Sequence, residues 1–198
     1  MWRLIYSILF LISDAAMAGA QVHEPLSVST RTVLHRAISD RVVPMLITLP
    51  RPEAKDWLDS MTERLEKRIP DIEERRAFLI TVHYEATRAG LDPELVLSII
   101  QVESNFRKYA VSSAGARGYM QVMPFWVEMI GNQEHNLFHL RVNLRYGCTI
   151  LRHYLDLEKG DYFRALGRYN GSLGKATYPD LILSAWRRNW TYAAAPAE

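Results

Sequence analysis

Apolar residues recur every three or four positions along most of this chain, with polar residues between them. Such spacing places the apolar side chains on one face of an α-helix, and no segment shows convincing β-type alternation. We therefore predict an all-α protein. Helices are expected over residues 29–42, 53–68, 72–89, 92–106, 121–129, 136–157, 162–169 and 178–187.

Residues with special backbone preferences mark several helix ends. Asp92 can cap a helix with its side chain, and Pro93 suits the first helical position. Gly90 is a natural stop for the preceding helix. Residues 109–119 hold two glycines, two serines and three alanines, so we expect a loop between the helices on either side.

Length and composition indicate a globular protein. The 198 residues, 48% of them hydrophobic, are enough for one full core with a small appendage. The net charge of +2 permits an anionic polymer as partner without requiring one. Cys148 is the single cysteine, so the fold relies on packing rather than on an internal disulfide.

The N-terminus is typical of a targeting segment. Arg3 precedes an apolar run over residues 4–12, and small residues follow with A-x-A patterns that end at Ala18 and Ala20. We predict a signal peptide at residues 1–20, cleaved after one of these alanines, and an exported, periplasmic protein without stable membrane insertion. The alternative is a buried N-terminal helix.

One carboxylate has an unusual setting. Glu103 lies near the C-terminal end of the 92–106 helix, one turn after Ile99 and Ile100. An apolar surrounding removes water from a carboxylate, and the negative end of the helix dipole also disfavours its charge, so both raise its pKa. A carboxyl that stays protonated near neutral pH can act as a general acid. The alternative is a charged, solvated glutamate at the helix edge.

Four short motifs follow one another around Glu103: QVES at 101–104, GYMQVMP at 118–124, NLRYG at 143–147 and ALGRYNGS at 165–172. Together they resemble the catalytic domain of the soluble lytic transglycosylases, lysozyme-like enzymes that cleave peptidoglycan. That family carries a Glu-Ser pair at a helix end, a G-L-M-Q-type segment, an N-x-x-x-G element and an A-x-x-Y-N-x-G element. The resemblance covers roughly residues 78–188, with Tyr119 where leucine is usual.

The resemblance implies a fold and a reaction. The fold would be a lysozyme-like (goose-type) helical domain at 78–190, preceded by a helical extension at 21–77 and followed by a disordered tail at 191–198. Glu103 would protonate the glycosidic oxygen between MurNAc and GlcNAc, then take the proton of the sugar's own 6-hydroxyl. The product would be a 1,6-anhydro sugar, made without metal or cofactor.

The residues near Glu103 favour a single catalytic acid independently. Ordinary glycosidases use two carboxyl groups on either side of the bond. No Asp or Glu lies between Ser104 and Val127, and we expect Glu128 on a helix surface. A distant acid such as Asp156 that folds back would still permit hydrolysis.

Further site residues follow from the resemblance by position. Those expected to bind substrate are Ser112, Gly118, Tyr119, Met120, Gln121, Met123, Tyr146, Tyr169 and Asn170. The Tyr169 hydroxyl would lie near Glu103 and tune its protonation, with Asn170 supporting it. Asn143 and Gly147 are expected to be structural and to allow close helix approach.

Structural roles are the alternatives at these positions. The Ser112 hydroxyl would cap a turn, Gly118 would be a turn glycine, and Gln121 would be a polar residue at a helix start. Core packing is the alternative for Tyr169 and Met120. For Met120 we prefer core packing to substrate contact.

The leading hypothesis is a peptidoglycan lytic transglycosylase. A muramidase-type hydrolase of the same fold and a non-catalytic wall-binding or assembly protein are the alternatives. We expect glycan strands as the partner and no nucleic acid, and an envelope-assembly machine as a further partner stays open. His135 and His139 have helical metal-ligand spacing, but no third ligand is evident, so no metal site is expected.

Overall fold

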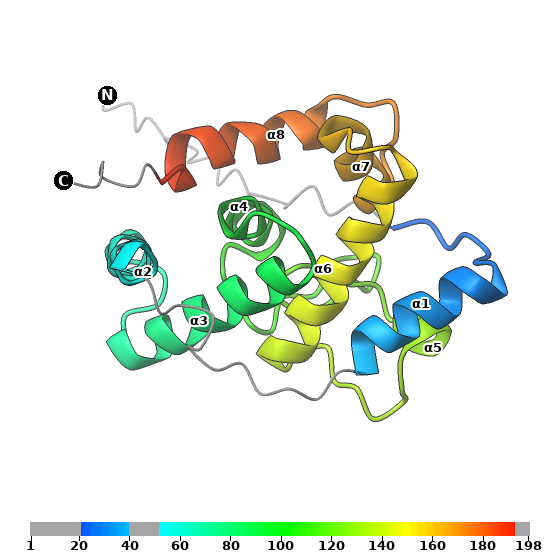
Figure 1. The fold of residues 1–198 in the computed structure, drawn as a ribbon, viewed down its shortest axis with the longest axis horizontal. Coiled ribbons are helices and arrows are strands. Elements are labelled where there is room, and N and C mark those ends of the chain that lie inside the picture. Colours follow the sequence, from blue (N-terminus) through cyan, green and yellow to red (C-terminus); the bar gives the residue numbers. More distant parts are fainter. Residues whose placement is uncertain (1–20, 40–51, 193–198) are drawn as a thin grey trace, which may run out of the picture.

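The computed structural model describes residues 21–39 and 52–192, and within them the regular elements are helices joined by loops (Figure 1). The elements are α1 (Val28–Ser39), α2 (Pro52–Arg64), α3 (Ile72–Arg88), α4 (Pro93–Ser104), α5 (Phe125–Ile130), α6 (Leu140–Leu157), α7 (Tyr162–Tyr169), α8 (Thr177–Ala185) and a short π-helix, η2 (Trp186–Trp190). Among these residues there are also two isolated antiparallel β-bridges, in which Arg117 pairs with Val111 and with Val122. The all-α prediction is confirmed.

Several predictions fall outside the described residues. The expected signal peptide at 1–20, the end of the first predicted helix and residues 193–198 of the expected tail all do so. None of the described helices is long and apolar enough to cross a membrane. The division into an extension at 21–77 and a catalytic domain at 78–190 stays a prediction.

Helix α4 forms the centre of the fold. Leu95, Val96, Leu97, Ile99 and Ile100 are all fully buried, so apolar side chains cover most of the surface of this helix, while Glu94 and Gln101 are partly exposed. A helix of that kind has to be enclosed by others. Helices α3, α8 and η2 pack against it, and Figure 1 shows it nearly end-on beneath α8.

The other helices form a second group around α6. Helix α6 packs against α3, α7 and α1, while α2 packs on α3 and α5 on α1. The apolar stripe predicted for the second helix is buried at Trp57, Met61 and Leu65. Helices α1 and α2 are therefore packed on the same body as the rest of the described chain.

The ends of α4 are fixed locally. Asp92 Oδ1 accepts hydrogen bonds from the backbone N–H groups of Glu94, at 2.7 Å, and Leu95, at 3.2 Å, which confirms the predicted cap. At the other end, Asn105 adopts a left-handed conformation with a φ of 47°, which turns the chain away immediately after Ser104. Glu103 consequently lies in the last turn.

Some helix ends differ from the predictions. Helix α5 begins at Phe125, whereas the predicted start is Gln121. Gln121 lies in the preceding loop, where its φ of 48° is incompatible with a right-handed helix. Helix α6 begins at Leu140 rather than near Asn136, whose side chain accepts a hydrogen bond from Phe138 N–H and closes a turn. Because His135 and His139 both precede α6, they do not share a helix face.

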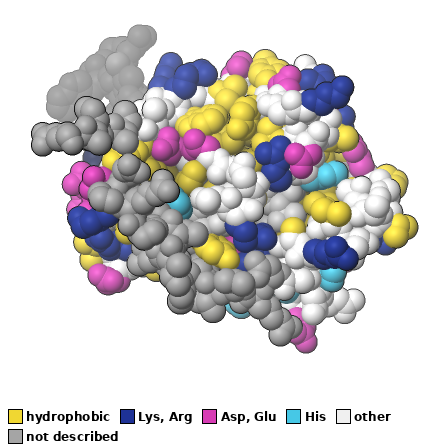
Figure 2. Space-filling view, viewed as in Figure 1, with side chains coloured by type: hydrophobic (Ala, Val, Ile, Leu, Met, Phe, Trp, Pro, Cys, Tyr) yellow, Lys and Arg dark blue, Asp and Glu magenta, His cyan; other side chains and the backbone are white. Residues whose placement is uncertain are grey.

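The surface shown in Figure 2 is electrostatically mixed. Over its described part, Lys and Arg side chains lie among Asp and Glu side chains, and hydrophobic groups reach the surface between them. This mixture agrees with the small net charge of the chain. Interspersed charges of both signs produce little long-range attraction of a charged partner.

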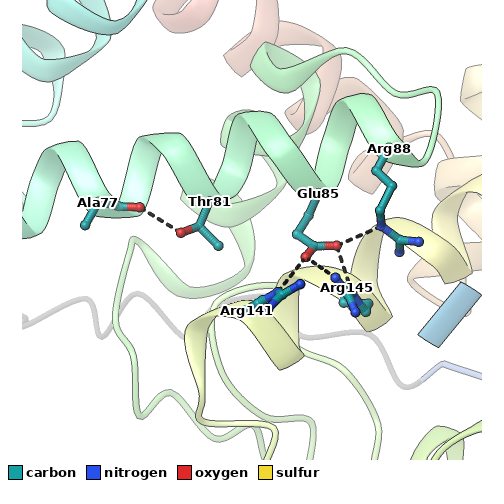
Figure 3. A network of polar contacts seen from close by, with 6 residues as sticks. All are labelled: Ala77, Thr81, Glu85, Arg88, Arg141 and Arg145. Atoms are coloured by element: carbon teal, nitrogen blue, oxygen red, sulfur yellow. Dashed lines mark hydrogen bonds and ion pairs between the residues drawn. The ribbon is translucent and has the colours of Figure 1, made fainter. Parts of the chain in front are cut away.

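A buried ion cluster joins α3 to α6 (Figure 3). Glu85 is fully buried, and its two oxygens accept hydrogen bonds from three arginines. Arg145 uses two nitrogens, with Nη2 at 2.8 Å and Nε at 3.1 Å, whereas Arg88 and Arg141 each use Nε. The desolvation of this carboxylate is offset by these charged donors.

We predict that Glu85→Gln destabilises the protein by about 3–5 kcal/mol, because three guanidinium groups would lose their shared counter-ion in a buried place. The matched control is Asp59→Asn, which breaks exposed ion pairs with Lys55 and Arg76 and should cost less than about 1 kcal/mol. Urea unfolding measures both free energies. Equal losses in the two variants would contradict the prediction.

Candidate active site

The carboxyl of Glu103 lies at the contact between α4 and α8. Only 6% of this residue is exposed. Tyr178, in the first turn of α8, is also buried, and its hydroxyl donates a hydrogen bond of 2.6 Å to Glu103 Oε1. Because α8 packs along α4, two segments 75 residues apart in the sequence meet at this bond.

Burial dominates the electrostatics of this carboxyl. Loss of hydration raises the pKa of Glu103 to about 8, and the hydrogen bond from Tyr178 opposes that shift by stabilising the ionised form. Within the described residues no salt bridge reaches Glu103, in contrast to Glu85. Glu103 therefore holds a proton at neutral pH and has the protonation state that a general acid requires.

The tyrosine that binds Glu103 is not the one expected from the sequence. Tyr169 is fully buried, but its hydroxyl donates to the backbone carbonyl of Met120 at 2.8 Å. Burial raises the pKa of Tyr169 well above its usual value of 10, and the nearby charge of Glu103 adds to that effect. Tyr169 thus lies close to Glu103, while Tyr178 makes the direct bond.

The segment around Met120 is held by α6. Asn143 Oδ1 accepts the Met120 N–H at 2.8 Å, and its Nδ2 donates to the carbonyls of Arg117 and Leu137. Gly118 has a φ of +75°, and a Cβ there would collide with the Asn143 amide. This close contact is the reason for a glycine at position 118.

Met120 itself is a core residue. It is fully buried, and a Cβ at Gly147 would collide with its side chain. The predicted structural roles of Asn143 and Gly147 are thereby confirmed, and core packing is the observed role of Met120.

Two polar residues that are expected at the substrate form hydrogen bonds within the loop that follows α4. Gln121 Nε2 donates to the carbonyls of Ala110, at 3.1 Å, and Gly118, at 2.9 Å. The Ser112 hydroxyl accepts the Ala116 N–H at 3.1 Å and closes a turn. These hydrogen bonds correspond to structural roles, because they stabilise the conformation of the loop that follows α4.

The remaining expected residues are spread around the domain. Tyr119 is buried with its ring 5.1 Å from that of Phe78. Tyr146 is fully buried, and its hydroxyl pairs with His135 Nδ1 at 2.8 Å rather than with the acid. Met123 is half-buried and its N–H donates to Gln21 Oε1, while Asn170 ends α7 and donates to Ser172 Oγ.

Tyr178 was missed because it stands outside the motifs. The sequence could have indicated it only through helical spacing, because Tyr178, Ile182 and Ala185 lie on the buried face of α8. A tyrosine on such a stripe needs a hydrogen-bond partner for its hydroxyl. Spacing alone does not identify that partner.

Other acidic side chains have different surroundings. Glu128 is exposed on α5, as predicted. Asp156 is exposed on α6, where its Oδ1 accepts a hydrogen bond of 2.6 Å from Arg152. In the part of the chain that the structure describes, no three His, Cys, Asp or Glu side chains are grouped so as to hold a metal ion.

The family model of the transglycosylase SLT domain matches residues 81–178. These residues form a transglycosylase SLT domain. The SLT domain begins within α3, includes Glu103 at the end of α4, and ends at Tyr178, so the hydrogen-bonded pair spans most of its length. The lysozyme-like helical fold expected from the motifs is the fold of this domain.

Named transglycosylases are similar to parts of this chain. A protein named transglycosylase from Enterobacteria phage PRD1 is 33% identical over 98 residues, which are 50% of this chain and 36% of the phage protein. Membrane-bound lytic murein transglycosylase C of Actinobacillus pleuropneumoniae serotype 5b is 51% identical over 49 residues, 25% of this chain and 13% of that protein. The chain therefore spans well under half the length of these relatives.

We predict that Tyr178→Phe raises the pKa of Glu103 further above its usual value, because the ionised carboxylate loses its hydrogen-bond donor. A ¹³C NMR titration of the Glu103 carboxyl measures the shift. Tyr146→Phe is the control, since it removes a buried hydroxyl that pairs with His135. A Glu103 pKa that stays constant or falls in Tyr178→Phe would show that this bond does not favour the ionised form.

We also predict that Glu103→Gln is more stable than the wild type above neutral pH. The folded pKa of about 8 exceeds the ordinary value of 4.5, so the wild type loses stability as the pH rises from 4.5 to 8. The difference should be small at pH 4 and on the order of 3–5 kcal/mol above pH 8. Urea unfolding across this range measures it. Glu128→Gln, an exposed control, should show no such trend.

Proposed function

We propose that this chain is a peptidoglycan lytic transglycosylase that cleaves the β-1,4 bond between MurNAc and GlcNAc, with Glu103 as acid and base. The observation that carries the proposal is the burial of the Glu103 carboxyl, with one hydrogen bond and no salt bridge among the described residues. The names of the relatives, transglycosylase and lytic murein transglycosylase C, support the reaction class and the substrate.

In the proposed reaction, two proton transfers pass through one carboxyl. Protonated Glu103 donates to the glycosidic oxygen as the bond from C1 to that oxygen breaks. The 6-hydroxyl of the same MurNAc then attacks C1, and its proton returns to the Glu103 carboxylate. The 1,6-anhydro ring closes without a water molecule, and the enzyme is restored to its starting protonation state.

In this scheme Tyr178 is a positioning residue. Its hydroxyl holds one oxygen of Glu103 and stabilises the carboxylate that exists between the two transfers. Tyr169 links the site to the loop that contains Met120, and Gln121 and Ser112 hold that loop. We propose that substrate contacts come from the exposed edges of this loop.

A muramidase-type hydrolase would need a second carboxyl to activate water or to act as nucleophile. Asp156, the acid that the sequence left open for this role, is paired with Arg152 and lines a cavity whose lining does not include Glu103. This position favours the non-hydrolytic route.

The proposal also includes a place of action. The apolar run and the A-x-A patterns of the first 20 residues support export, and the relatives named as membrane-bound murein enzymes support action at the bacterial cell wall. We propose that this segment directs the protein to the periplasm and is then cleaved off.

Digestion of purified peptidoglycan tests the function. Wild-type protein should release fragments with 1,6-anhydroMurNAc ends, detected by mass spectrometry. Glu103→Gln should reduce the rate by about 100-fold or more, because the amide cannot donate a proton. Glu128→Gln, which removes an exposed carboxyl elsewhere, should retain the wild-type rate.

The outcomes separate the alternatives. Fragments with reducing ends alone would identify a hydrolase. Release by Glu103→Gln at the wild-type rate would overturn the catalytic assignment. Binding of peptidoglycan without any release, by a wild-type protein that unfolds cooperatively, would indicate a wall-binding protein.

A further inference from the structure

The end of α4 that contains Glu103 is held by segments outside the matched SLT domain. Helix α2 and the turn after it precede residues 81–178, and η2 follows them. Both segments form hydrogen bonds to the last turn of α4 or to the residue that ends it. These contacts therefore lie outside the motifs that surround Glu103 in the sequence.

Helix η2 holds α4 from one side. Gln101 precedes Glu103 by two residues in α4, and its Oε1 accepts hydrogen bonds from Trp190 Nε1, at 2.8 Å, and Asn189 Nδ2, at 3.1 Å. Trp190 is only 1% exposed, so its indole N–H has to find its partner within the protein. The place of η2 and the place of the α4 end are thus linked by side chains.

Helix α2 in turn holds η2. Arg64 Nη1 donates to the backbone carbonyls of Asn189 and Thr191, both at 3.1 Å. The carbonyls at the C-terminal end of a helix carry partial negative charge, so a cation is favourable there. The contact joins a residue before the SLT domain to residues after it.

Arg68, in the turn after α2, contacts both η2 and the residues that follow α4. The carbon at the centre of its guanidinium group lies 5.4 Å from the centre of the Phe106 ring and 5.9 Å from that of the Trp190 ring. Its Nε donates to Asn105 Oδ1 at 3.2 Å. The Phe106 and Trp190 rings also contact each other, with centres 5.5 Å apart.

The residues that Arg68 contacts after α4 have an unfavourable backbone conformation. Asn105 and Phe106 have φ values of 47° and 64°. Positive φ is uncommon for residues other than glycine and is least favourable for a bulky side chain such as that of Phe106. Such a conformation persists only where the surrounding structure holds it. Arg68 contacts both side chains and so stabilises the turn that ends α4.

We propose that Arg68 is a positioning residue that fixes the turn after α4 and thereby keeps the Glu103 carboxyl in its enclosed place. The consequence for catalysis rests on the proposed function of Glu103, whereas the enclosure of the carboxyl does not. A looser turn would admit water to the last turn of α4.

The pKa of Glu103 tests the proposal without any assay of activity. In Arg68→Ala this pKa should fall from about 8 toward 4.5, because the carboxyl regains hydration. Loss of the arginine charge alone would act in the opposite direction, since a nearby cation favours the ionised carboxylate. A ¹³C NMR titration of the full-length protein therefore separates positioning from a charge effect by the sign of the shift.

The titratable groups beside Glu103 stay the same in this variant. They are Tyr178 of α8 and Tyr169 of α7, and burial raises the pKa of both hydroxyls well above 10. Burial and the hydrogen bond from Tyr178 set the pKa of Glu103 in the described structure, with no contribution from a charged side chain. A change in the pKa of Glu103 in Arg68→Ala therefore reports on its hydration.

Two further variants make the test specific. Arg68→Lys keeps a cation beside the two rings, and its pKa for Glu103 should lie between those of the wild type and Arg68→Ala. Lys67→Ala is the matched control, because Lys67 is the preceding residue, is likewise exposed, and has no hydrogen-bond, ion-pair or ring partner among the described residues. It should leave the pKa of Glu103 unchanged.

The rate of peptidoglycan cleavage gives a second readout, measured well below the unfolding temperature of each variant. In Arg68→Ala, kcat should fall by about fivefold, the factor that corresponds to loss of one exposed cation–π contact. KM should change by less than about twofold, because the acid rather than the binding of glycan is affected. Lys67→Ala should match the wild type in both constants.

The results distinguish this proposal from the proposed function. A fall in the pKa of Glu103 in Arg68→Ala, with partial recovery in Arg68→Lys and none of the change in Lys67→Ala, supports positioning. A constant or raised pKa in Arg68→Ala, or an equal shift in Lys67→Ala, would overturn it. If the wild type releases no 1,6-anhydro fragments, the proposed function fails, and the pKa comparison still decides whether Arg68 positions the carboxyl.

Discussion

Exclusion of water from the Glu103 carboxyl is the constraint on which this structure depends. Helix α4 is apolar over most of its surface, so α3, α8 and η2 enclose it, and the carboxyl in its last turn is enclosed with it. One hydrogen bond from Tyr178 is too little to offset the lost hydration, and the pKa of Glu103 rises to about 8. The packing that stabilises the fold therefore also sets the protonation state on which the proposed chemistry relies.

The same protein contains a second buried carboxyl with the opposite surroundings. Glu85 receives hydrogen bonds from three arginines and connects α3 to α6, whereas no ion pair reaches Glu103 among the described residues. Charged partners stabilise a buried carboxylate in its ionised form, and it then links helices as a structural element. A buried carboxyl without charged partners can bind and release a proton. Both carboxyl groups are buried, so the difference between a structural carboxylate and a candidate acid comes from their hydrogen-bonding partners.

The loop after α4 shows how motif residues can serve the site indirectly. A side chain at Gly118 would collide with Asn143, and one at Gly147 would collide with Met120. The side-chain amide of Gln121 donates hydrogen bonds to two backbone carbonyls. These residues hold the loop against α6. Position in a motif thus marks residues that the site requires, including those that never touch the reacting group.

Local patterns were sufficient for much of the fold. Apolar spacing predicted α7 at its observed bounds and α4 within two residues at its far end, and Asp92 caps α4 as expected, because spacing and capping act within a few residues of sequence. The sequence also singled out Glu103 from its neighbours in α4. Tertiary structure alone decided that Tyr178, and not Tyr169, binds that carboxyl. A buried hydroxyl finds its partner through the packing of distant helices, which no spacing along one segment encodes.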